Sequence, residues 1–175
     1  MAIKLTIDDW EFAQKRPCCG VLATAVAAQT TFKEAWAYFL GIQPGAIRYS
    51  GRWKGGLTLT DIEAGLKNFG VQYREFRWDD AEHAPPADVA GKSLRWFICC
   101  AANPATTYFV ITTGHAQIVQ GSMIMDQKGP TKLGDYWGGN KKIKHVWQII
   151  EAPQAALDTL GLPLFDYVLQ QKGVK

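Results

Sequence analysis

The uncharged run Pro17–Gln29 constrains this chain more than any other stretch, because it consists mainly of alanine, valine and leucine. Alanine and leucine have high helix propensity, so the run after Pro17 predicts a helix that is buried on most sides. Two adjacent cysteines, Cys18 and Cys19, lie where this helix would begin. Unpaired backbone N–H groups and the positive end of the helix dipole favour a thiolate there. The run therefore predicts a candidate nucleophile, although buried cysteines also pack as small apolar side chains.

The composition is that of an ordinary globular protein. Hydrophobic residues make up 47% of the 175 residues, charged residues make up 20%, and the net charge is only +3. We expect one domain, residues 1–175, with a substantial core. No apolar run is long enough to span a membrane, and Lys4, Asp8 and Asp9 lie too early for a signal peptide. These features predict a cytoplasmic protein with reduced thiols and no membrane association.

The remaining two cysteines are also adjacent, at Cys99 and Cys100. Neighbouring side chains point in different directions in a helix or a strand, so each pair offers one sulfur to a given site. This spacing does not favour a zinc site. Without a secretory context it does not favour a disulfide framework either, and the sequence indicates no metal or cofactor.

Two further helices are predicted before the middle of the chain. Apolar residues recur at helical spacing in Thr31–Leu40, with Thr30 or Thr31 as its cap and Gly41 at its end. Thr60–Glu63 has the pattern of a capping box and predicts the start of a third helix, which Gly70 ends.

The pattern then changes to short apolar segments typical of strands. Val71–Trp78 alternates like a strand. Five later segments are predicted strands: Leu94–Ala101, Thr107–Thr112, His115–Gln120, Met123–Asp126 and Ile143–Glu151. Two long basic segments, Gln43–Leu57 and Lys128–Lys142, are predicted loops. Helices followed by an antiparallel sheet indicate an α+β fold.

A cysteine nucleophile needs a base, which is usually a histidine. The chain has three histidines. His83 lies in a proline-containing connection and His145 lies beside lysines in a late strand. His115 opens a strand directly after Thr113-Gly114, where its ring can face a neighbouring element. A lone histidine is commonly a surface or core residue, but hairpin geometry favours His115 as the base.

Gly121-Ser122 suits a two-residue type II′ turn, which pairs Gln120 with Met123. In that register Asp126 lies diagonal to His115 on the same face of the sheet. A carboxylate there can orient the imidazole and stabilise its charged form. A three-residue loop would point Asp126 to the other face.

A tetrahedral intermediate also needs hydrogen-bond donors for its oxyanion. The backbone N–H of Cys19 is one candidate. The side-chain amide of Gln14, a few residues before the thiol, is the other.

These residues resemble the papain-like cysteine peptidases. Cys19–Ala27, Thr113–Ala116 and Met125-Asp126 are similar to the small papain-like peptidase domains of bacteriophages, which are related to bacteriocin leader peptidases. The resemblance implies a papain-like fold in which the nucleophile helix packs on a C-terminal antiparallel sheet. It also implies that Cys19, which precedes a glycine, is the nucleophile rather than Cys18. His115, Asp126 and Gln14 then take the roles of base, orienting acid and oxyanion donor.

The predicted function is a thiol hydrolase that cleaves an amide or isopeptide bond of a peptide or protein substrate. The two basic loops favour an acidic peptide. One alternative is a catalytically silent protein of the same fold that binds a host partner. Another is nucleic-acid binding through the basic loops, but acids elsewhere balance the lysines, so nucleic acid is not favoured. The oligomeric state, the bond type and the role of Cys18 stay open.

Overall fold

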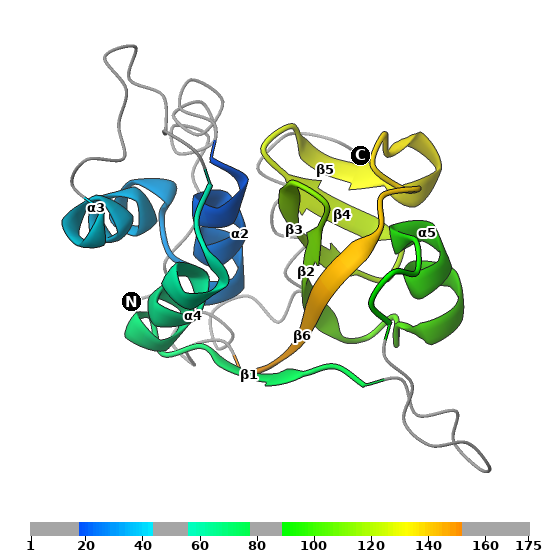
Figure 1. Cartoon of the computed structure of the whole chain (residues 1–175), viewed down its shortest axis with the longest axis horizontal. Coiled ribbons are helices and arrows are strands. Elements are labelled where there is room, and N and C mark those ends of the chain that lie inside the picture. Colours follow the sequence, from blue (N-terminus) through cyan, green and yellow to red (C-terminus); the bar gives the residue numbers. More distant parts are fainter. Residues whose placement is uncertain (1–17, 44–55, 78–88, 152–175) are drawn as a thin grey trace.

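The computed structural model describes residues 18–43, 56–77 and 89–151 of the chain. In these ranges the protein is an α+β fold with four α-helices and a six-stranded antiparallel sheet (Figure 1). The helices are α2 (Cys19–Ala28), α3 (Phe32–Ile42), α4 (Leu59–Asn68) and α5 (Leu94–Trp96). The predicted fold class is confirmed at this level.

Helix α2 is the buried helix that its composition predicted. Every residue in it except Cys19 is buried, and Gln29 caps its C-terminal end with a left-handed backbone, at φ 52°. Helix α3 begins at the predicted cap, because the Thr31 side chain accepts a hydrogen bond from the Glu34 N–H. No helix in the described ranges combines the length and the apolar character needed to cross a membrane.

Two predicted helix boundaries are wrong. The capping box uses Thr58 and Asp61 rather than Thr60 and Glu63, so α4 begins at Leu59. Helix α3 continues through Gly41 to Ile42, because the Gln43 N–H still donates to the Phe39 carbonyl.

The strands form one sheet in the order β1-β6-β2-β3-β4-β5. Their bounds are β1 (Gln72–Glu75), β2 (Thr107–Thr112), β3 (His115–Gln120), β4 (Met123–Asp126), β5 (Gly129–Lys132) and β6 (Ile143–Glu151). The predicted strands β2, β3, β4 and β6 are confirmed with the predicted bounds. The strand predicted over Val71–Trp78 is shorter, and its last residue lies outside the described ranges.

The strand predicted over Leu94–Ala101 is wrong. The segment forms α5 and a π-helix, Phe97–Ala101. The Ser93 side chain accepts a hydrogen bond from the Trp96 N–H and so starts a helical turn. Apolar runs of this length occur in buried strands and buried helices alike, so periodicity did not separate the two.

The loop predicted over Lys128–Lys142 is also partly wrong, because it contains β5 and a 3₁₀-helix, Leu133–Asp135. Strand β5 lies at the edge of the sheet and pairs with β4, with Asp126 opposite Gly129. Pro130 is tolerated there because an edge strand needs hydrogen bonds on one side only.

The sheet is covered on both faces. Helix α2 packs against β3 and β4 on one side, with α3 and α4 behind it, while α5 and the π-helix lie on the other side (Figure 1). The first layer contains Ile118 and Met125 of the sheet, and the second contains Val119 and Ile124. Alternate residues of β3 and β4 thus face opposite layers, and α2 packs on the face that carries Ile118 and Met125.

Gly65 allows α4 to pack closely on α2 and α3. A Cβ at this position would lie 2.5 Å from Cζ of Phe39, which is fully buried. We expect Gly65→Ala to lower the free energy of unfolding by about 1–3 kcal/mol through overpacking. Gly41→Ala is the matched control, because nothing lies within 4 Å of its Cβ position, and we expect it to be neutral or to stabilise α3. Urea denaturation measures both, and a stabilised Gly65→Ala would contradict this packing.

Candidate functional site

Cys19 is the first residue of α2. Cys18 precedes the helix with an extended backbone, at φ −143° and ψ 102°. The N–H of Cys19 therefore belongs to the first turn of the helix. No carbonyl of the same helix can accept a hydrogen bond from it. No acidic side chain lies in this turn to offset the positive end of the helix dipole. The thiol is partly exposed and lies next to the start of β3, where the backbone N–H of Ala116 helps to lower its pKa.

His115 lies at the start of β3, as predicted. It pairs with Thr112 across the β2–β3 hairpin, whose turn contains Gly114 with a φ of 71°. The His115 residue is only 7% exposed. Its ring is held between Asp126 on one side and the thiol of Cys19 on the other.

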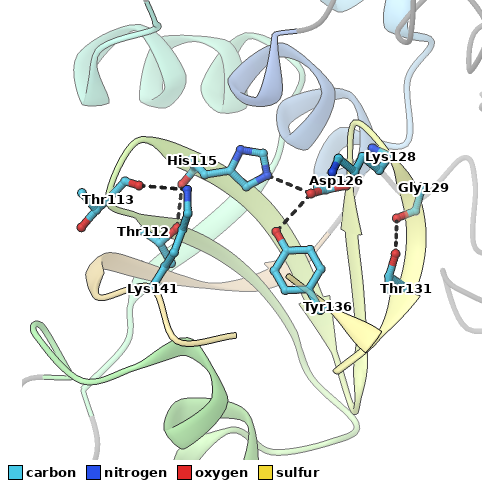
Figure 2. Close-up of polar contacts among 9 residues, drawn as sticks. All are labelled: Thr112, Thr113, His115, Asp126, Lys128, Gly129, Thr131, Tyr136 and Lys141. Atoms are coloured by element: carbon cyan, nitrogen blue, oxygen red, sulfur yellow. Dashed lines mark hydrogen bonds and ion pairs between the residues drawn. The ribbon is translucent and has the colours of Figure 1, made fainter. Parts of the chain in front are cut away.

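The predicted hairpin between β3 and β4 is confirmed. Gln120 pairs with Met123, and Gly121 has the positive φ, 55°, that the first central residue of a type II′ turn needs. This register brings His115 Nε2 to 3.0 Å from Asp126 Oδ2 (Figure 2). Because Nε2 bonds to Asp126, the other ring nitrogen, Nδ1, is left to interact with the thiol of Cys19.

Asp126 has two partners that the sequence did not identify. The Tyr136 hydroxyl donates to Oδ2 over 3.1 Å, and the Lys128 backbone N–H donates to Oδ1 over 2.7 Å. Figure 2 shows the Tyr136 hydroxyl and the His115 ring directed at the same carboxylate. Gly138 makes room for this arrangement, since a Cβ there would lie 2.7 Å from the Tyr136 ring. The only sequence signal was the motif Tyr136-Trp137-Gly138-Gly139, whose position depends on tertiary contacts.

The charges of the three groups favour one another. Burial disfavours each charged form, but the hydrogen bonds with Asp126 and Cys19 outweigh it and raise the pKa of His115 to about 9. The pKa of Cys19 is lowered from its ordinary value of 9.0, because hydrogen bonds and the His115 charge outweigh burial. For Asp126, too, burial is outweighed by its interactions. The hydrogen bonds from His115, the Lys128 N–H and Tyr136 lower its pKa. The pKa shifts of Cys19 and His115 thus both favour a thiolate–imidazolium pair.

Cys18 has the opposite environment. It is 7% exposed, and burial raises the pKa of its thiol to about 12. A thiol held in its neutral form is a weak nucleophile. The two neighbouring cysteines, which composition alone left equivalent, therefore differ sharply, and Cys19 is the better candidate. All four cysteines of the chain are free.

An open cleft of about 410 Å³ lies over Cys19 and His115. One wall is formed by the start of α2 and by Leu57 and Leu59 at the start of α4, and the opposite wall by the β2–β3 hairpin and Gln127. A Cβ on Gly20 would lie 3.1 Å from Leu57, so this glycine lets the wall approach the cysteine closely. The Cys19 thiol and the His115 ring therefore both border this cleft.

The exposed indole of Trp137 lies beside the His115 ring, with the ring centroids 5.5 Å apart. Lys141 Nζ lies 4.3 Å and Lys128 Nζ lies 5.3 Å from the centroid of the same indole. The indole therefore shields one side of the imidazole from water while its own surface stays accessible.

Part of the predicted site lies outside the described residues. Gln14 lies outside the described residues, and so do His83 and most of the basic segment Gln43–Leu57. His145 lies in β6 and does not line the cleft. Within the described ranges, no group of three or more histidine, cysteine or acidic side chains is placed to hold a metal ion.

No protein-family model matches this chain, and searches of curated proteins and of solved structures find no match either.

Proposed function

We propose that this protein is a papain-like thiol hydrolase that cleaves an amide or isopeptide bond through Cys19, His115 and Asp126. The observation that supports this most directly is that His115 is hydrogen-bonded to Asp126 and lines an open cleft together with Cys19, whose pKa it lowers. A nucleophile at the start of a buried helix, facing a histidine at the start of a sheet strand, also supports the papain-like assignment drawn from sequence resemblance.

In the proposed reaction the Cys19 thiolate attacks the carbonyl carbon of the substrate. The resulting oxyanion is stabilised by the Cys19 backbone N–H. The imidazolium of His115 then gives its proton to the leaving amine, the carbon–nitrogen bond breaks, and a thioester forms on Cys19. His115 next takes a proton from water, which attacks the thioester and releases the acid and the thiolate. Asp126 holds the imidazole orientation and stabilises its positive charge throughout.

The second oxyanion donor stays a prediction. The Gln14 side chain was predicted for this role because it precedes the thiol by a few residues. The cytoplasmic location, the phage-like origin and the identity of the peptide or protein substrate are likewise predictions that rest on the sequence.

Site-resolved alkylation tests the proposed thiolate. We expect iodoacetamide to modify Cys19 well below pH 9, because its pKa is lowered, and to spare Cys18, whose pKa is about 12. The rate at each cysteine is measured by mass spectrometry from pH 4 to pH 10. The exposed Cys99 and Cys100 serve as internal references for reagent activity. His115→Ala is expected to remove the low-pH reactivity of Cys19, while His145→Ala keeps it.

If Cys19 reacts no faster than the reference cysteines at pH 6, the ion pair is absent from the free protein. The catalytically silent binding protein would then be the better description of this fold. If Cys18 reacts instead of Cys19, the assignment of the nucleophile is wrong.

A further inference from the structure

A positively charged rim lies beside the histidine, outside the cleft itself. We define this rim as Lys128, Trp137 and Lys141, since both ammonium groups lie over the indole. Trp137 is 53% exposed, which is unusual for a large apolar side chain that contacts a buried histidine. Lys128 is exposed and Lys141 is partly exposed, with Lys141 Nζ donating to the Thr113 carbonyl over 3.3 Å.

Neither rim lysine has a carboxylate partner within residues 18–43, 56–77 and 89–151. The nearest buried acid, Asp126, is already satisfied by His115, Tyr136 and a backbone N–H. Among the described residues that line the cleft, His115 is the only one with a titratable basic group, and none carries a carboxylate. Within the described part of the chain, the rim thus places two unpaired ammonium groups on the side of the imidazole.

The proposed reaction determines which part of the substrate would lie next to the rim. Because His115 protonates the leaving amine, that amine must lie on the histidine side of Cys19. The part of the substrate that continues from the amine then passes the groups that flank His115. Trp137 contacts the His115 ring at 5.5 Å between centroids, so the rim lies on the leaving-group side.

Resting on the proposed function, we propose that the rim is a leaving-group subsite that selects peptides with an aspartate or glutamate just after the cleaved bond. A carboxylate placed over the indole edge would meet two ammonium groups, while its methylene groups would pack on the ring. Charge pairs at a partly exposed surface contribute only a modest free energy, and salt screens them. We therefore expect kcat/KM to be about 3- to 30-fold higher for a peptide with an acidic residue after the bond than for its neutral counterpart. This ratio should fall as the salt concentration rises.

The test is a two-step cleavage experiment on the whole protein. A mixed peptide library is first incubated with the wild type, and the cleaved bonds are identified by mass spectrometry. A cleaved peptide is then synthesised with glutamate or with glutamine directly after the bond, and kcat/KM is measured for each in wild type and in K128Q/K141Q. The exposed pair K33Q/K67Q, on α3 and α4, is the charge-matched control.

We expect the wild type and K33Q/K67Q to prefer the glutamate peptide and K128Q/K141Q to lose that preference. The ratio of the two peptides is used because a merely structural defect would lower both rates together. Cleavage with no acidic preference, or a preference that survives in K128Q/K141Q, would overturn the subsite and leave the hydrolase intact. A wild type that cleaves no peptide in the library overturns the hydrolase proposal and the subsite with it.

Discussion

Cys19→Ser is expected to reduce hydrolysis by on the order of 10⁴-fold or more, to the level of the uncatalysed background. The serine hydroxyl is nearly the size of the thiol, so the variant should fold normally. However, it does not ionise beside His115 as the Cys19 thiol is expected to do. The measurement is the initial rate on any peptide that the wild type cleaves, together with urea denaturation to establish that the variant is folded.

Cys18→Ala is the matched control for this prediction. The Cys18 thiol is buried and its pKa is raised to about 12, so it is not positioned to act as a thiolate. We expect this variant to keep most of the wild-type rate and to lose only a small part of the stability. If Cys18→Ala and Cys19→Ser lose activity equally while both remain folded, the distinction between the two thiols is wrong.

The sequence was sufficient to predict the His115–Asp126 pair because a single local feature determined it. A two-residue turn at Gly121-Ser122 sets the register of β3 against β4, and that register sets which side chains share a face. The buried helix α2 was predictable for a similar reason, since its uncharged composition is consistent only with burial on most sides. Both inferences use contacts that are local or nearly local in the chain.

The parts that the sequence did not predict depend on distant contacts. Tyr136 lies near Asp126 because β5 folds back along β4, and the polar, basic composition of Lys128–Lys142 had predicted a loop there. The helical segment Leu94–Ala101 has an apolar pattern that a buried strand shares. The contrast between Cys18 and Cys19 also needed the fold, because burial on one side and His115 on the other distinguish two chemically identical neighbours.

Asp126→Asn is expected to have the second-largest effect, a loss of about 10²- to 10⁴-fold in hydrolysis. The carboxylate is 2% exposed, and its charge opposes the cost of burying the imidazolium. Without that charge, burial lowers the pKa of His115, and the Cys19–His115 pair shifts toward neutral thiol and neutral imidazole. The pH profile of Cys19 alkylation should therefore move to higher pH, which site-resolved mass spectrometry measures directly.

Stability should change with pH in a direction that the two pKa shifts determine. Asp126, whose pKa is lowered from 3.8, contributes stability above pH 3.8 that is lost as the pH falls through its native pKa. His115, whose pKa is raised from 6.5 to about 9, contributes stability below pH 6.5 that is lost as the pH rises through 9. The free energy of unfolding of the wild type should thus exceed that of Asp126→Asn by about 1–3 kcal/mol. This difference should be largest between pH 3.8 and pH 6.5.

Tyr136→Phe is the matched control for Asp126→Asn, because it removes one hydrogen bond to the carboxylate and keeps both the charge and the buried ring. We expect it to lower hydrolysis by less than about tenfold and to leave the pH profile of Cys19 alkylation close to that of the wild type. If Asp126→Asn loses much more activity than Tyr136→Phe and shifts the alkylation profile, the cause is the lost charge of Asp126 and not the loss of one hydrogen bond. An Asp126→Asn protein with the wild-type alkylation profile would mean that Cys19 and His115 form their ion pair without the carboxylate.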